Sequence, residues 1–217
     1  MSTRGRPRRI EPDAIAQAVL DMGLENSSMR RVAARLGVSL PGLYHHVKNQ
    51  DELLALATRR ALQISPPPVY QGQGWPVWLR SYAHYIRDTL SSEPALLEKF
   101  INGAADHDGE IDYVADALDA LQGVGLEPEA ALDVWAAVTA IAMGSVSEGH
   151  RERVHSAAGR PWLSRVFGVI ARREPGECSA LRAVAQSGCD PFGEESFDRR
   201  LSLLFGGIAV RYGLSAQ

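Results

Sequence analysis

The stretch that decides the fold is SMRRVAARLGVSLPGLYHHVKNQDELL, residues 28–54. Ser28 is a good N-cap for a first helix, and Gly37 can end that helix in a left-handed conformation without steric cost. A tight turn then leads to Ser39, which caps a second short helix that buries Leu43 and Val47. Two short helices joined in this way predict a helix–turn–helix, whose second helix lies in the major groove of DNA.

Helical patterns flank this stretch on both sides. Residues 12–22 begin with a proline that suits a first turn, carry apolar residues at helical spacing and end before Gly23. Asn49, followed three residues later by Glu52, resembles a capping box and opens an amphipathic helix that reaches residue 64. These closely spaced helices predict a small head over residues 1–64.

A proline- and glycine-rich boundary follows the head, with SPPP at 65–68 and QGQG at 71–74. The pattern leaves open whether residues 65–75 break or continue the fourth helix. Beyond the boundary, residues 76–217 form a larger second domain. Its expected helices lie near residues 78–90, 94–102, 111–121, 128–155, 161–170, 178–185 and 194–212. No alternating strand pattern is bounded by a hairpin signal, so the sequence predicts an all-α fold with about 9–10 helices.

Composition excludes several classes of protein. The 217 residues are 45% hydrophobic and 23% charged, as in an ordinary globular protein. No run of about 18 apolar residues predicts a membrane span, and the N-terminus lacks the apolar core of a secretory signal. We therefore expect a cytoplasmic protein that does not meet a membrane. No G-x-S-x-G, H-E-x-x-H, Walker or glycine-rich nucleotide motif occurs, so we do not expect an enzyme.

The net charge of −3 is unevenly distributed. Residues 1–65 carry ten Lys and Arg against six Asp and Glu, whereas the rest of the chain carries 13 against 20. A basic front end joined to an acidic remainder indicates that only the N-terminal part meets a polyanion, although a solvated basic face would give the same count.

Three motifs within residues 28–54 resemble the TetR-type transcriptional repressors, and the tetracycline-repressor subfamily in particular. They are LGVS at 36–39, LYHHV at 43–47 and KNQDELL at 48–54. The likeness continues loosely through residues 125–149 and 197–213. It implies a homodimer that places two heads on a palindromic operator and is released by a small molecule bound in the C-terminal domain. The dimer is implied to form through helices near 128–155 and 194–212.

The resemblance also assigns roles in the head. It implies that Arg30 reaches a guanine, which a guanidinium can bond bidentately, and that Tyr44 bonds a phosphate. His46 matches a histidine that approaches the DNA backbone, and Leu40 or Pro41 offers apolar contact to thymine methyl groups. The full set of candidate DNA contacts is Arg4, Arg6, Ser28, Arg30, Ser39, Leu40, Pro41, Gly42, Tyr44, His45, His46 and Lys48.

The N-terminal arm offers another route to DNA. Arg4-Gly5-Arg6-Pro7 resembles an AT-hook core, and extended arginines suit a narrow A·T-rich minor groove. A solubilising tail is the alternative role of this arm. Two alternatives for the whole protein also stay open: a ligand-independent or activating regulator, and an architectural minor-groove binder that works through the arm.

The second domain supplies candidate walls for a ligand pocket. They are Trp78, Tyr82, Tyr85, Phe100, Asn102, Trp135, Thr139 and Trp162. Ordinary core packing is the alternative role of each aromatic residue among them. The aromatic composition predicts an apolar or amphipathic ligand. Residues 95–104 lack the histidine with which the tetracycline repressor holds a drug–magnesium chelate, which argues against that ligand. We expect no cofactor and no metal site.

Overall fold

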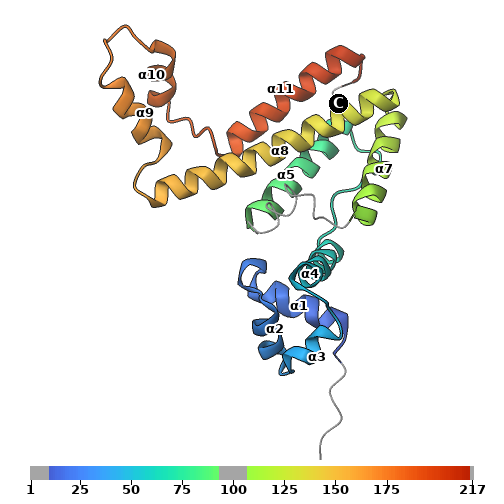
Figure 1. Cartoon of the computed structure of the whole chain (residues 1–217). Coiled ribbons are helices and arrows are strands. Elements are labelled where there is room, and N and C mark those ends of the chain that lie inside the picture. Colours follow the sequence, from blue (N-terminus) through green and yellow to red (C-terminus); the bar gives the residue numbers. More distant parts are fainter. Residues whose placement is uncertain (1–9, 93–106, 216–217) are drawn as a thin grey trace, which may run out of the picture. The chain divides into compact units, whose positions relative to one another are not determined.

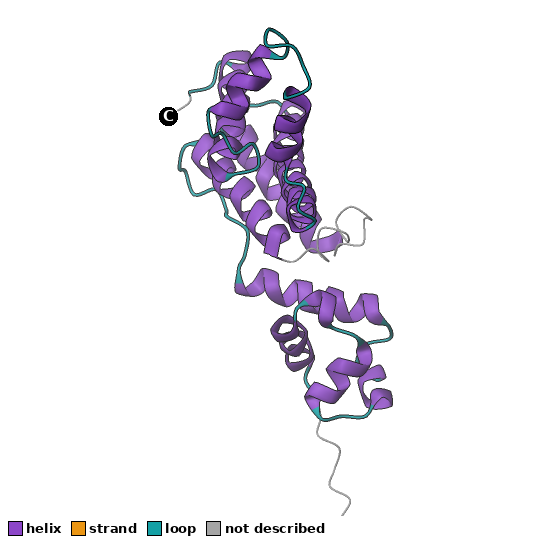
Figure 2. Cartoon of the chain, turned by 90° about the vertical axis from the view of Figure 1, so that its left-hand side faces the viewer, coloured by secondary structure: helices purple, strands orange, loops and turns teal. Residues whose placement is uncertain are grey.

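The computed structural model describes residues 10–92 and 107–215, which divide into two compact units. The N-terminal unit contains the described residues up to Pro67 together with residues 107–112, and the C-terminal unit contains Pro68–Ser92 and the residues from Tyr113 onward. Every regular element in the described residues is a helix, and none is a strand (Figure 2). The predicted all-α class is confirmed.

The N-terminal unit is a cluster of short helices. They are α1 (Pro12–Met22), the 3₁₀ turn η1 (Leu24–Asn26), α2 (Met29–Leu36), α3 (Leu40–Tyr44) and α4 (Gln50–Ile64). Helix α1 packs against both α2 and α4, and α2 packs against α3 (Figure 1). The core consists of fully buried aliphatic side chains, namely Ile15, Val19, Val32, Leu43 and Leu53. The apolar periodicity of the sequence therefore marks the faces that the unit buries.

Side-chain caps fix the starts of three of these helices, as the sequence predicts. The acceptors and donors are Ser28 Oγ with Arg31 N–H (3.3 Å), Ser39 Oγ with Gly42 N–H (3.1 Å), and Asn49 Oδ1 with Glu52 N–H (2.8 Å). Each bond satisfies a backbone donor that the first turn of a helix leaves without an internal partner. The return bond of the expected capping box differs. Glu52 Oε2 accepts a hydrogen bond from Lys48 N–H, at 2.5 Å, rather than from Asn49 N–H.

The C-terminal unit contains the longer helices, apart from residues 107–112 at the start of α7. They are α5 (Trp75–Ser92), α7 (His107–Gly123), α8 (Pro128–Ala157), α9 (Trp162–Ile170), α10 (Ser179–Gln186) and α11 (Glu194–Tyr212). Residues 65–74 are not helical, so the linker breaks the helical run after Ile64. Trp75, which the sequence places in the linker, is instead the buried first residue of α5. The short helix expected at 94–102 lies outside the described residues.

Helix α8 is long and apolar enough to cross a membrane by length and composition alone. In this structure it packs against α5, α9 and α11 and buries a stripe that includes Val134, Trp135 and Val138. A core helix of a bundle has the same composition, because its buried stripe must be apolar. We therefore interpret α8 as the central helix of the C-terminal unit.

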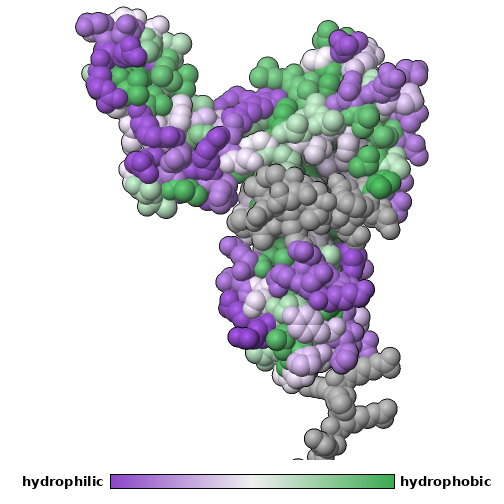
Figure 3. All heavy atoms as spheres, viewed as in Figure 1, coloured by the Kyte–Doolittle hydropathy of each residue, from purple (hydrophilic) through white to green (hydrophobic). Residues whose placement is uncertain are grey.

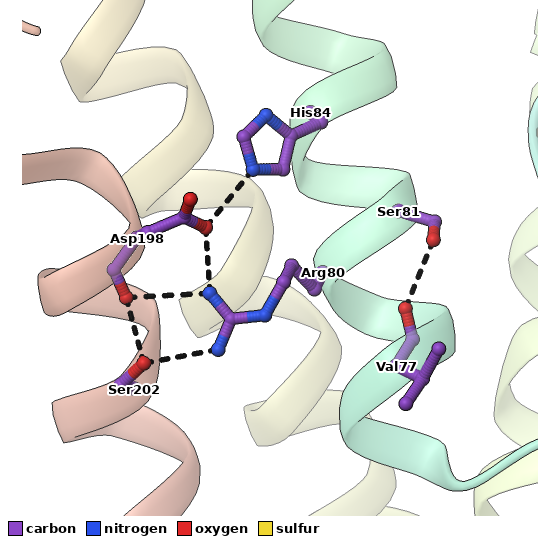
Figure 4. A network of polar contacts seen from close by, with 6 residues as sticks. All are labelled: Val77, Arg80, Ser81, His84, Asp198 and Ser202. Atoms are coloured by element: carbon purple, nitrogen blue, oxygen red, sulfur yellow. Dashed lines mark hydrogen bonds and ion pairs between the residues drawn. The ribbon is translucent and has the colours of Figure 1, made fainter. Parts of the chain in front are cut away.

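A polar network ties α5 to α11 (Figure 4). The Asp198 carboxylate accepts from Arg80 Nη1 at 2.6 Å and lies 3.0 Å from His84 Nε2. Arg80 also donates to the Asp198 carbonyl and to Ser202 Oγ. The Phe197 ring lies edge-on to His84, with centroids 5.1 Å apart. Because these contacts join residues more than a hundred positions apart in sequence, they fix the position of α11 on α5.

This network predicts a contribution to stability that depends on pH. Hydrogen bonds from His84 and then Arg80 lower the pKa of Asp198, although partial burial opposes the shift. A carboxyl whose folded pKa lies below its unfolded value stabilises the fold above the unfolded value, and loses that contribution as the pH falls through the folded value. We expect Asp198→Asn to cost less than about 1 kcal/mol at pH 7, since 39% of the side chain is exposed.

The same change should cost almost nothing at a pH below the lowered pKa of Asp198, and urea unfolding at the two pH values measures the difference. Asp88→Asn, which removes an exposed carboxylate from α5, is the control. A cost that stays equal at both pH values would contradict the prediction.

Candidate DNA interface and ligand cavity

The turn between α2 and α3 has the geometry that a helix–turn–helix requires. Gly37 adopts φ 69° and ψ 31°, a left-handed conformation that glycine reaches at no steric cost. Gly37 N–H donates to the Ala34 carbonyl (3.2 Å), and Val38 N–H donates to the Ala33 carbonyl (3.0 Å). This pair of bonds satisfies the last carbonyl groups of α2 and turns the chain sharply toward α3.

Helix α3 divides its residues between the core and solvent. Leu43 is fully buried and Val47, just beyond the helix, is 2% exposed. Pro41 and Tyr44 are exposed, and the Tyr44 side chain retains 48% of its surface. A large aromatic side chain that an otherwise packed head leaves in water is available to a partner. Helix α3 therefore presents an outward surface of the kind that reads a groove.

The other predicted contacts from the described part of the head also reach solvent, fully or in part. Ser28, Arg30, Ser39 and Lys48 are exposed, whereas Leu40 and Gly42 are half-buried. Arg30 forms no ion pair within the described residues, whereas Arg35 on the same helix lies 3.3 Å from Asp21. Arg30 thus keeps a guanidinium that a base or phosphate can engage. The arm residues Arg4 and Arg6 lie outside the described residues.

His45 and His46 lie just beyond the end of the recognition helix α3 and not within it. Helix α3 ends at Tyr44, so exposed His45 forms its C-cap and exposed His46 lies in the following turn. His46 N–H still donates to the Leu43 carbonyl at 2.9 Å, which holds the turn against the helix. Both imidazoles therefore reach solvent from the junction of α3 and α4.

A buried serine, which the sequence analysis did not single out, holds the head together. Ser27 is 3% exposed, and its hydroxyl donates to the Gly23 carbonyl at 2.7 Å and to the Val19 carbonyl at 3.2 Å. The Gln50 side chain donates to the Ser27 carbonyl. Gln50 therefore ties the start of α4 to the segment before α2. The position of Ser27 beside the N-cap Ser28 is the one sequence feature that draws attention to it. That position does not reveal that Gln50, 23 residues away, bonds to it.

In the C-terminal unit, three of the predicted pocket walls meet in an aromatic cluster. The Tyr82 and Trp135 rings stack with centroids 4.2 Å apart, and Trp78 stacks on Trp135 at 6.1 Å. Two tyrosines that the sequence did not single out complete the cluster. Tyr113 lies 5.7 Å from Tyr82, and Tyr70 lies 5.4 Å from Trp78. Helical periodicity shows that a residue is buried but not which distant ring it meets.

The remaining predicted wall residues have different surroundings. Trp162 is separate from the cluster, because it packs edge-on to Phe192 and against the α9–α10 core. Tyr85 is half-buried on α5, and burial raises the pKa of its phenol. The Thr139 hydroxyl is buried, with no hydrogen-bond partner among the described residues. Phe100 and Asn102 lie outside the described residues.

Among the described residues of the C-terminal unit, two hollows stand out. One is a cavity of about 270 Å³ beside the aromatic cluster, with Tyr70, Trp78 and Tyr113 among its lining residues. The other is a groove of about 390 Å³ between α8 and α11, lined by Val134, Leu204 and other residues. Exposed hydrophobic side chains lie near the groove, with Leu203 at 78% and Val210 at 87% of full exposure. Figure 3 shows hydrophobic residues gathered over these helices.

These features define a class of protein, in which a helix–turn–helix head is joined to a helical unit that has an aromatic cavity. Residues 13–57 match the family described as bacterial regulatory proteins, tetR family. The chain belongs to this TetR family. The family consists of transcriptional regulators, not enzymes.

Relatives cover much of the chain. The HTH-type transcriptional repressor Rv1353c of Mycobacterium tuberculosis is 27% identical over 160 residues, which are 69% of this chain and 61% of that protein. Tetracycline repressor protein class D of Escherichia coli is 31% identical over 156 residues, 67% of this chain and 66% of that protein. The chain therefore matches less than two thirds of the length of each of these two relatives.

The fold is shared with solved structures. Apo ActR of Streptomyces coelicolor aligns with a TM-score of 0.74 at 19% identity, over 96% of this chain and 99% of that chain. ActR has also been solved in complex with actinorhodin, and that structure aligns with a TM-score of 0.73 over 95% of this chain and 100% of that chain at 19% identity. At this identity the likeness concerns the fold.

Proposed function

We propose that the protein is a sequence-specific DNA-binding repressor that a small molecule releases from a palindromic operator. The observation that carries the proposal is the outward surface of α3, set by the Gly37 turn and anchored by buried Leu43. Its place of action is then the cytoplasm, where the DNA lies. Membership of a family of transcriptional regulators supports this function.

The head supplies both kinds of DNA contact. Arg30 reads a guanine edge, and Leu40 or Pro41 touches thymine methyl groups. Contacts to phosphates come from Tyr44 and from a second group: Ser28, Ser39, His45, His46 and Lys48. Arg4 and Arg6 of the arm enter the adjacent minor groove. Phosphate contacts fix the register of the head, whereas the base contacts select the sequence.

A second copy of the chain covers the groove between α8 and α11. Leu203 and Val210 are almost fully exposed in the single chain, and Leu132 on α8 is 51% exposed. Exposed aliphatic side chains of this size next to a groove are typical of an interface between subunits. A two-fold interface places two equal heads on DNA, so the operator is an inverted repeat.

Release follows from binding in the C-terminal unit. A ligand weakens operator binding only if it binds the DNA-incompetent conformation better, and a coupling of about 1–3 kcal/mol gives roughly 5–150-fold. The aromatic cluster supports a ligand site, because pockets for small molecules are lined mainly by apolar and aromatic side chains with few polar groups. ActR, which has a similar fold, has been crystallised in complex with actinorhodin.

The test is selection of duplex DNA by the purified chain from a random library at near-physiological salt. We expect a single inverted repeat with half-sites in successive major grooves. Recovery of A·T-rich tracts without symmetry would contradict the proposal and favour an architectural binder that works through the arm. Deletion of residues 1–9 separates the two, because a helix–turn–helix reader keeps its sequence preference without the arm.

Two substitutions test the contact assignments on the selected operator. Tyr44→Phe removes a hydroxyl that bonds a phosphate, so it should weaken binding to every duplex by about tenfold or more. Arg30→Ala should instead relax the preference at one base pair, because a bidentate contact supplies about 1–3 kcal/mol of discrimination. Competition between the operator and its single-base variants measures both. Equal loss on all sequences for Arg30→Ala would overturn the base contact.

A further inference from the structure

The segment that connects α4 to α5 is held firmly in the C-terminal unit. We call residues 68–73 the linker strap. The Pro68 carbonyl accepts two hydrogen bonds, from Trp78 Nε1 at 2.8 Å and from the Tyr113 hydroxyl at 2.7 Å. The Gln73 side chain donates to the Val69 carbonyl at 3.2 Å, which closes the strap on itself. The strap is therefore anchored to α5 and α7 rather than being a free spacer.

The anchored strap forms one wall of the 270 Å³ cavity. Val69 and Tyr70 come from the strap, Trp78 comes from α5, and Tyr113 comes from α7. Three aromatic rings from three different segments thus line one space. The volume lies just below the range usual for drug-sized ligands, so it suits a molecule of about two or three fused rings.

The charge of the cavity is one-sided. Asp116 and Asp119 of α7 are among its lining residues, and no basic side chain is among those described there. The α5 arginines engage other partners, since Arg80 bonds Asp198 and Arg87 lies 4.9 Å from the Phe197 ring. Residues three apart on a helix are neighbours on its surface, so the two carboxylates place negative charge together at the cavity.

Tyr113 does not change the net charge of the cavity. Burial, and then the neighbouring Tyr82 and Tyr85, raise the pKa of the Tyr113 phenol. The hydroxyl therefore stays protonated at physiological pH and keeps donating to Pro68. Among the described residues that line the cavity, only Asp116 and Asp119 are charged.

We propose that this cavity binds a small planar aromatic cation, with Tyr70, Trp78 and Tyr113 against its rings and Asp116 and Asp119 beside its charge. Aromatic faces attract cations through their quadrupoles, and the carboxylates add direct attraction. An anion of the same shape meets repulsion from both aspartates. A neutral molecule of the same shape keeps the ring contacts but loses the charge terms.

The site also supplies a route to regulation, which rests on the proposed function. The strap is continuous along the chain with α4, which ends at Ile64. A ligand that displaces Val69 or Tyr70 acts on the segment of chain that joins the two units. Release of DNA by the ligand then depends on the two hydrogen bonds that the Pro68 carbonyl accepts from Trp78 and Tyr113. Tyr113→Phe removes one of these two bonds while keeping the aromatic ring.

The test measures binding of three bicyclic probes to the full chain by equilibrium dialysis: N-methylquinolinium, neutral quinoline at pH 7.5, and 2-naphthoate. We expect the cation to bind most tightly and the anion most weakly. Asp116→Asn and Asp119→Asn should each weaken cation binding about fivefold and leave quinoline binding unchanged. Asp112→Asn is the matched control, because it removes an exposed carboxylate from the same helix but does not line the cavity.

Tyr70→Ala is a second variant, at a half-buried residue of the linker strap, and it should weaken binding of the cation and of quinoline together. Equal binding of all three probes, no binding at millimolar concentration, or unchanged cation binding in both aspartate variants overturns the proposal. Operator binding by the same preparations without any probe reports separately on the proposed function. A chain that binds the cation but selects no operator would refute the repressor and leave the cavity assignment intact.

Discussion

Replacing Leu203 and Val210 together with aspartate is expected to convert the protein to a monomer and to weaken operator binding at least 100-fold. Both side chains are almost fully exposed in the single chain, so the change should not unfold it. In a dimer the new charges would be buried against the second copy at high cost. Loss of the link between two heads removes an effective-concentration gain of about 10²–10⁴.

Sedimentation velocity and operator titration measure the two effects on the same sample. Val77→Asp is the control, since Val77 is a 58%-exposed residue of α5 that does not line the groove. If the double variant sediments as a dimer and binds the operator like the unmodified chain, another surface forms the interface. The comparison of the two variants thus shows whether the dimer interface lies at the α8–α11 groove or elsewhere on the C-terminal unit.

The second large effect is expected from Leu43→Ala in α3. Leu43 is fully buried in a small unit, and truncation of a buried leucine costs about 2–5 kcal/mol. A unit of this size has only about 3–5 kcal/mol of stability to lose. The head should therefore unfold, and specific DNA binding should disappear, while the C-terminal unit keeps its fold.

Amide hydrogen exchange resolves this outcome, because it reports on the two units separately. Leu62→Ala makes the same chemical change at a 41%-exposed position of α4 and should leave both exchange and operator binding nearly unchanged. Operator binding by Leu43→Ala within threefold of the unmodified chain would show that α3 does not need this anchor.

Much of the head could be predicted from the sequence because its determinants are local. Ser28, Ser39 and Asn49 cap helices through bonds to residues three positions away, so spacing alone reveals them. Gly37 ends α2 for a reason confined to its own backbone conformation. The candidate DNA contacts follow from these boundaries, and their roles stay a prediction for experiment.

The candidate ligand site depended on contacts that periodicity does not encode. Sequence patterns identified Trp78, Tyr82 and Trp135 as aromatic residues on helical faces, and these three do meet. They did not reveal Tyr113, and they grouped Trp162 with residues from which the structure separates it. A helical pattern states which face is buried but not which partner covers it.

The sequence by itself therefore determined the capped helix starts of the head, its turn and the family, because caps, left-handed glycine and short motifs act within a few residues. Only the tertiary structure decided what those helices bring together. The Pro68 carbonyl meets Trp78 and Tyr113, and Asp198 meets Arg80, across 10 to 118 positions of chain. Such contacts form only when whole helices pack, since the free energy that selects them comes from burial summed over many residues rather than from any local preference.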